Sequence, residues 1–218
     1  MLERLTDRVT GEVSAAVQRR AANRLPVLAI RLLEAGISLW RNNGWFRFDD
    51  SEISCSVQLY RWLQEARRAN RSLVVIEVSI EHLLLTPDMI EGLVSPSSAR
   101  RPDIRFTASD TGLSLECKRL LAPAVWHQDY VHKGMERFVT SAYGAGESLG
   151  LMVGYLQDVT VDACLPSINK YIAAHTAMGN PHQLSDDHAA SYGTWYRSDH
   201  ARSGDVPIHL SHVWINLN

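Results

Sequence analysis

The sequence RPDIRFTASDTGLSLECKRL, residues 101–120, predicts two extended segments joined by a turn. Apolar residues alternate with polar ones in 104–107 and again in 113–120, as they do in strands with one buried face. The stretch 109–112 between them, Ser-Asp-Thr-Gly, consists of turn-forming residues. We therefore expect a β-hairpin in which Glu116 and Lys118 share one face of the second strand.

Three chemically active residues are expected to meet at one end of this hairpin. Glu116 and Lys118 share a face, and pairing of the two strands can bring Asp103 beside them. Two carboxylates and an ammonium at a sheet end can hold a divalent cation and polarise a phosphodiester bond. The alternative is that both acids are solvated on an exposed sheet face and that Lys118 only pairs with Glu116.

Pro102-Asp103 and Glu116-Cys117-Lys118 resemble the signature of the PD-(D/E)xK nuclease superfamily. The context is similar too, because both pieces fall on expected strands, with a helix before them and a helix and an apolar strand after them. A narrower likeness is to small restriction-endonuclease-like proteins often linked to phage defence. It is carried by residues 116–120, Tyr130, Gly134, Arg137, Phe138, Tyr143, residues 150–155, 198–200 and 208–212.

The resemblance implies a Mg²⁺-dependent nuclease, with Mn²⁺ as the other candidate cation, that cuts nucleic acid, with DNA as the expected substrate. Asp103, Glu116 and the backbone carbonyl of Cys117 would be metal ligands. Lys118 would orient or deprotonate the attacking water, or offset charge on the phosphate. The alternative is a binding or scaffolding subunit on a nuclease-like fold, inactive or dependent on a partner.

A third carboxylate is expected from one of several glutamates. Glu52 fits the acidic residue that this superfamily often supplies from the helix before the sheet. However, Asp49 followed by Glu52 also forms a capping-box pattern, which needs no catalytic role. Glu77, on an apolar strand, is the main rival donor, and Glu81 is a weaker one.

Two further groups of side chains are candidates for binding a nucleic acid or a metal ion. Tyr130, Lys133 and Arg137 have helical spacing, so they are expected to share a face that either grips a nucleic-acid backbone or is ordinary helix surface. The nine histidines lack an accompanying cysteine pair, so we expect no zinc site. His200 and His212, within the resembled C-terminal segment, would either buttress the core or contact phosphate.

Composition sets limits on partners and setting. A net charge of −2 argues against avid non-specific nucleic-acid binding, so positive charge must be local or come from a partner. Three cysteines without paired spacing argue against a disulfide framework and favour a reducing cytoplasm. No apolar run approaches the roughly 20 residues of a membrane span.

Alternating helices and strands around the hairpin predict an α/β fold, with a mixed central β-sheet flanked by helices and, by the resemblance, a restriction-endonuclease-like core. We expect residues 1–218 to form a single nuclease-like domain, with a helical extension at 1–41 and a core at 45–217. Helices are expected over 2–22 and 27–40, with Pro26 starting the second. Their apolar stripes predict a partner surface, and hence a homodimer or a hetero-complex with a defence-system partner. The stripes are Leu2, Leu5, Val9 and Val13, then Leu28, Leu32 and Leu39.

Overall fold

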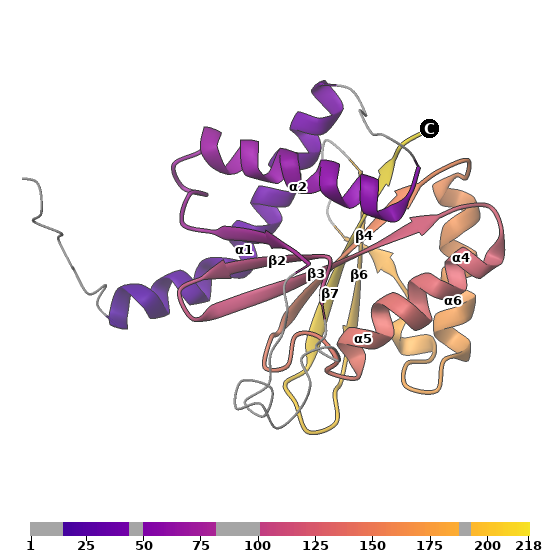
Figure 1. The fold of residues 1–218 in the computed structure, drawn as a ribbon. Helices are drawn as coiled ribbons and strands as arrows, with labels where there is room; N and C mark the ends of the chain where they lie inside the picture. The colour runs from indigo at the N-terminus through magenta and orange to yellow at the C-terminus, as the bar shows by residue number, and fades with distance from the viewer. Residues whose placement is uncertain (1–14, 44–49, 82–100, 188–192) are drawn as a thin grey trace, which may run out of the picture.

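A seven-stranded mixed β-sheet forms the centre of the described part of the protein, with helices on both of its faces (Figure 1). The computed structural model describes residues 15–43, 50–81, 101–187 and 193–218, with side chains from residue 24 onward in the first helix. This arrangement confirms the expected α/β class, with a mixed sheet flanked by helices.

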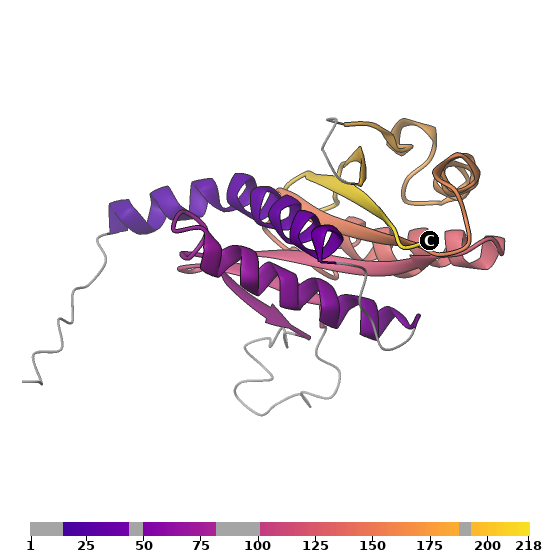
Figure 2. The same cartoon turned by 90° about the horizontal axis from the view of Figure 1, so that it is seen from above.

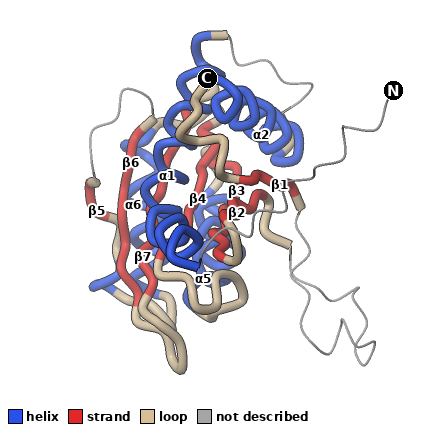
Figure 3. The backbone as a smooth tube through the Cα atoms, turned by 90° about the vertical axis from the view of Figure 1, so that its left-hand side faces the viewer, coloured by secondary structure: helices blue, strands red, loops and turns tan. Residues whose placement is uncertain are grey.

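The strands of the sheet run in the order β1-β2-β3-β4-β7-β6-β5, visible from edge to edge in Figure 3. The three central strands β3, β4 and β7 are parallel, and the outer strands pair antiparallel. Their bounds are β1 Glu77–Ile80, β2 Ile104–Ala108, β3 Thr111–Leu120, β4 Leu149–Leu156, β5 Ser185–Asp186, β6 Thr194–His200 and β7 Ile208–Asn216.

The expected hairpin is present as β2 and β3. Ile104 pairs with Leu115 and Ala108 with Thr111, and the turn between them places Ser109 at φ 53°. Pairing with β2 ends at Leu115, whereas β3 continues beside β4 to Leu120. Residues 116–120 of β3 therefore present an edge that β2 does not cover, next to the residues that precede β2.

Two groups of helices cover the two faces of the sheet. Helices α1 (Ala15–Asn42) and α2 (Glu52–Ala69) pack side by side on one face, where Gly36 of α1 lets the backbones approach at Leu63 (Figure 2). The other face carries a continuous helical segment made of α4 (Ala124–Asp129), the π-helix η2 (Tyr130–Met135) and α5 (Glu136–Val139), followed by α6 (Val161–Ala174). A short 3₁₀ turn, η3, spans Asn180–His182. Within the described ranges, no helix is both long and apolar enough to cross a membrane.

The first helix differs from the sequence-based expectation in two respects. It is one helix that runs through Pro26, rather than two helices that meet there. Leu28 and Leu32 are buried against α2 and the sheet, and Leu39 is half-buried on the same core. This stripe is therefore an internal packing surface that covers one face of the sheet. The prediction that this stripe forms a partner surface was wrong. The stripe at residues 2–13 lies outside the described residues.

Candidate functional site

The uncovered edge of β3 receives two carboxylates from outside the strand. The backbone N–H of Cys117 donates a hydrogen bond to Asp103 Oδ2 at 2.7 Å. Two residues further along, the N–H of Arg119 donates to Glu52 Oε2 at 3.2 Å. Strand β3 thus holds Asp103, just before β2, and Glu52, the first residue of α2, next to each other along one edge. The position of both acids is set by where the β2 pairing stops.

Lys118 lies at the centre of an oxygen cluster at this edge. Its Nζ is 2.9 Å from Glu52 Oε1, 2.9 Å from Glu116 Oε1 and 2.7 Å from the carbonyl oxygen of Cys117. The Cys117 thiol takes the opposite direction, into the core beside Tyr155, so only the backbone of Cys117 faces the site. The structure therefore brings together Glu52, Glu116, Lys118 and the Cys117 carbonyl, as the resemblance implied.

Arg137 joins this cluster from the other face of the sheet. Its Nη1 lies 2.5 Å from Glu116 Oε1 and donates to the hydroxyl of Tyr143 at 3.0 Å. Tyr143 in turn donates to the carbonyl of Arg101 at 2.8 Å, just ahead of Asp103. Gly134, one turn before Arg137, packs closely on β4, where an added Cβ would lie 2.7 Å from the end of the Met152 side chain. Tyr143 was not expected among the site residues, because its separation from Arg137 along the chain matches neither a helical nor a strand period.

Glu116 is the most unusual group of the cluster. Its side chain is fully buried, and among the described residues its Oε2 has no hydrogen-bond partner. Burial, reinforced by the nearby Asp103 carboxylate, raises the pKa of Glu116 to about 7. Burial likewise raises the pKa of Asp103, although Lys118 opposes this shift. A buried carboxylate with a free oxygen and a perturbed pKa is characteristic of a functional site.

The charges favour binding of a cation. Among the described residues, Glu52, Asp103 and Glu116 face two cationic groups, Lys118 and Arg137, so this part of the cluster carries one surplus negative charge when every group is ionised. Burial disfavours the Lys118 ammonium, but Glu116, Glu52 and Asp103 outweigh burial and raise its pKa, so the lysine stays charged. The donor set consists of carboxylate and carbonyl oxygens, which are the ligands that Mg²⁺ and Mn²⁺ prefer. The residues present therefore fit a hard divalent cation.

We expect cation affinity at this cluster to rise with pH. Between the ordinary value of 4.5 and about 7, folded Glu116 holds a proton that the unfolded chain has released, so its contribution to stability falls as pH rises through this window. A cation binds only the ionised carboxylate, so cation affinity rises with pH. Below pH 7 it rises by about tenfold per pH unit if binding displaces one proton. Calorimetric titration with Mn²⁺ across this window measures the slope. A flat affinity profile would contradict the assignment of Glu116 as a ligand.

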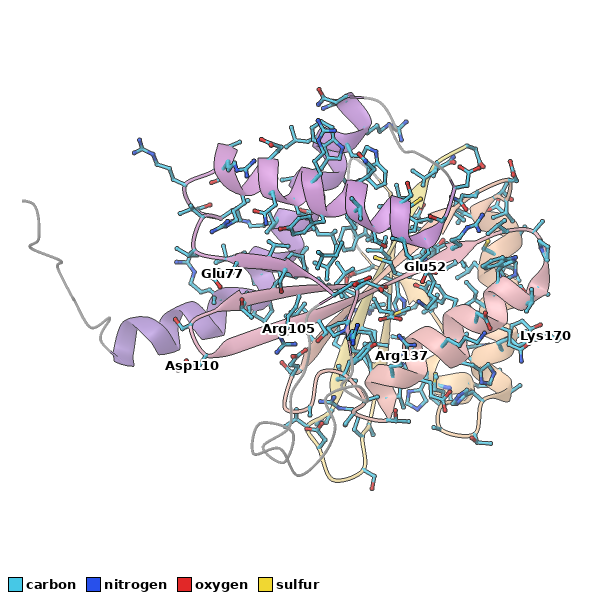
Figure 4. The ribbon with its side chains drawn as sticks, viewed as in Figure 1. Glu52, Glu77, Arg105, Asp110, Arg137 and Lys170 are labelled. Atoms are coloured by element: carbon cyan, nitrogen blue, oxygen red, sulfur yellow. The ribbon has the colours of Figure 1, made fainter. Side chains whose placement is uncertain are left out.

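Glu52 reaches the cluster and its rivals do not. Helix α2 begins at Glu52 with Ser51 as its N-cap, and the Ser51 side chain accepts the N–H of Ser54. The capping-box explanation of Glu52 was therefore wrong, because its carboxylate reaches across to β3. Glu77 is exposed and lies opposite Thr107, near the end of β2 that is remote from Asp103. Figure 4 shows Glu77 and Glu52 well apart. Glu81 approaches Asp103 only through its backbone N–H, 3.0 Å from the Asp103 carbonyl oxygen.

The expected shared face of Tyr130, Lys133 and Arg137 does not form. Tyr130 is fully buried and bonds to His212 and Trp214. Lys133 is exposed and pairs with Asp129 one turn away. The residues lie on or beside the π-helix η2, whose wider i→i+5 turns rotate Tyr130 out of the row that an α-helix would make. Of the three, only Arg137 reaches the cluster.

His200 and His212 belong to a buried polar chain behind this helix. Ser198 Oγ lies 2.8 Å from Nε2 of His200 and 3.0 Å from Nε2 of His212, and both rings are buried. His212 continues the chain to the hydroxyl of Tyr130. Of the two roles expected for these histidines, the structure shows the buttressing of the core.

Comparison with protein-family models, with curated proteins and with solved structures finds no match for this chain. The family resemblance therefore rests on the sequence motif.

Proposed function

We propose that this protein is a Mg²⁺-dependent nuclease of the PD-(D/E)xK superfamily that hydrolyses phosphodiester bonds of DNA. The observation that carries the proposal is the convergence of Asp103, Glu116 and Lys118 at the open edge of β3, with one oxygen of the buried Glu116 left without a partner among the described residues. Glu52 completes the acidic set from α2. Mn²⁺ has the same ligand preference and is the alternative cation.

The order of elements supports a restriction-endonuclease-like core. Helix α2 precedes the antiparallel strands β1, β2 and β3, and the α4–η2–α5 segment then leads to β4, which lies parallel to β3. This is the order of helix, hairpin, helix and strand that accompanies the motif in the sequence. The three cysteines are buried and none of them takes part in a disulfide, which supports a reducing, cytoplasmic setting. A role in anti-phage defence follows from the narrower resemblance alone.

Each site residue has a separate part in the proposed chemistry. Glu52, Asp103, Glu116 and the Cys117 carbonyl would hold the cation, which supplies a polarised phosphate and a more acidic bound water. Because Lys118 stays charged, its part is to offset negative charge that develops on the phosphate rather than to remove a proton. Lys118 contacts the same oxygens that the cation would bind, so the ammonium and the cation compete for them. Arg137, about two-fifths exposed, can contact a neighbouring phosphate while it holds Glu116.

Incubation of supercoiled plasmid DNA with the purified chain tests the proposal directly. We expect nicking or linearisation with Mg²⁺ or Mn²⁺ and none with EDTA. The Glu52→Gln variant keeps the shape of the side chain and removes its charge, so we expect cleavage to fall by about tenfold to a hundredfold. Glu77→Gln, which changes the same residue type on an exposed strand away from the cluster, should cleave at the parental rate.

The outcomes separate the enzyme from its alternative. Parental cleavage by Glu52→Gln would remove Glu52 from the site. A chain that binds Mn²⁺ but cleaves nothing would instead be the binding or scaffolding subunit, active only with a partner. The net charge of −2 favours such dependence for DNA affinity, since tight non-specific binders are usually basic.

A further inference from the structure

A second group of metal-ligating side chains lies away from the β3 edge, between the two helical segments on the other face of the sheet. His132 of η2 and Glu136 of α5 are four residues apart, with His132 Nδ1 4.0 Å from Glu136 Oε2. His175, which caps the end of α6, points Nε2 at the same oxygen from 3.6 Å. The rings of His132 and His175 have centroids 4.7 Å apart.

The spacing of these three groups fits one small cation. One ligand atom from each residue lies within 4.8 Å of the other two. Ligands bonded to tetrahedral zinc at about 2.0–2.2 Å stand about 3.3–3.6 Å from one another. The Glu136 oxygen, 3.6 Å from His175 and 4.0 Å from His132, is already close to that spacing. Two imidazoles and a carboxylate are a ligand set that suits Zn²⁺ and related borderline metals rather than Mg²⁺.

The three side chains differ in burial, which leaves the group accessible to solvent on one side. The His175 side chain is 4% exposed, whereas those of His132 and Glu136 are each 40% exposed. A cation held there would rest on a fixed buried ligand and two accessible ones, with room for water at a remaining position. Closed structural zinc sites, in contrast, use four protein ligands.

One contact sets a cost for binding at His175. The backbone N–H of Ala177 donates to His175 Nδ1 at 3.2 Å, so the neutral ring carries its proton on Nε2, facing Glu136. A metal on Nε2 takes the place of that proton and requires one on Nδ1, so the ring must turn or the 175–177 turn must open. Affinity is therefore expected to be well below that of closed zinc sites.

We propose that His132, Glu136 and His175 form a second cation site that takes Zn²⁺, separate from the carboxylate cluster and independent of the proposed nuclease activity. The sequence did not indicate it, because His175 lies some distance along the chain from the other two and no cysteine marks the site. A cation there ties the end of α6 to α5, the short helix that also carries Arg137. It would therefore stabilise the helical cover on this face of the sheet.

Cobalt(II) is the probe, because Co²⁺ replaces Zn²⁺ and shows visible absorption bands whose intensity reports low coordination number. The EDTA-treated, dialysed chain is titrated with Co²⁺ in excess Mg²⁺, which occupies the carboxylate cluster. We expect one Co²⁺ per chain with visible bands that added Zn²⁺ abolishes. His132→Ala and Glu136→Gln, both partly exposed positions, should weaken binding by about tenfold or more.

Two controls make the outcome specific. His209→Ala removes a partly exposed histidine that also contacts a carboxylate, Asp199, at 2.8 Å but belongs to no three-ligand group among the described residues, and it should bind Co²⁺ as the parent does. Asp103→Ala alters the carboxylate cluster and should leave the cobalt spectrum unchanged, so this result stands whether or not the chain is a nuclease. Absence of the bands in the parent, or their survival in both His132→Ala and Glu136→Gln, would overturn the proposal. Circular dichroism verifies the fold of each variant.

Discussion

Lys118→Ala is expected to abolish DNA cleavage while the cation stays bound. The ammonium is held by Glu52, Glu116 and the Cys117 carbonyl, and it carries the positive charge at the centre of the cluster. Loss of a positioned charge of this kind costs about 10²–10³ in rate. The same change removes a competitor for the oxygens, so Mn²⁺ affinity should be at least that of the parent. Single-turnover cleavage and calorimetry measure the two effects separately. Both are performed well above pH 8, because loss of Lys118 raises the pKa of Glu116 above the parent's value of about 7.

Lys133→Ala is the matched control for this prediction. Lys133 is exposed, pairs only with Asp129 on its own helix among the described residues, and does not reach the cluster. It should therefore cleave at the parental rate, because an exposed pair of this kind contributes little. Equal rates for Lys118→Ala and the parent would remove the most specific residue of the nuclease proposal.

Asp103→Asn is expected to weaken cation binding strongly, and cleavage with it. The amide oxygen of asparagine can still accept the N–H of Cys117, so the β3 edge keeps its backbone contact while the charge is lost. Removing that charge leaves the cluster without its surplus negative charge. It also lowers the pKa of Glu116, since Asp103 is the second cause of that raised value after burial. We expect Mn²⁺ affinity to fall by about a hundredfold, measured by calorimetry.

Asp110→Asn serves as the comparison, because Asp110 lies exposed in the turn between β2 and β3 and away from the cluster (Figure 4). It should bind Mn²⁺ and cleave DNA as the parent does. If a folded Asp103→Asn protein kept parental cation affinity, the role of Asp103 would be structural, through its hydrogen bond to β3. Glu116 and Glu52 would then be the remaining carboxylate ligands.

Much of the candidate site followed from local sequence patterns. Alternation in 113–120 placed Glu116 and Lys118 on one face, and the turn residues at 109–112 set the hairpin that brings Asp103 to them. Such patterns are reliable because side chains alternate strictly along a strand, whatever surrounds it. The same alternation turns the Cys117 side chain to the opposite face, which leaves only its backbone for the site.

Longer-range features did not follow from the sequence. The apolar stripe at Leu28 and Leu32 was expected to face a partner, yet it covers the sheet, because a stripe records only that a surface is buried and not by what. Tyr130 was expected on the same helix face as Arg137, but the π-helix between them changes the rotation per residue. The sequence of residues 130–135 does not indicate that wider turn. Capping and cross-strand roles competed for Glu52, and local spacing could not rank them.

The sequence by itself therefore determined the α/β class, the hairpin and the faces of its strands, because these depend on periods of a few residues. Only the tertiary structure decided which glutamate reaches Lys118, how Arg137 meets Glu116 and where His175 meets His132. Those contacts join residues far apart in the chain, and they depend on where strand pairing stops and how helices settle on the sheet. Burial at that junction, rather than residue type, raises the pKa of Glu116 and leaves one of its oxygens unpartnered among the described residues.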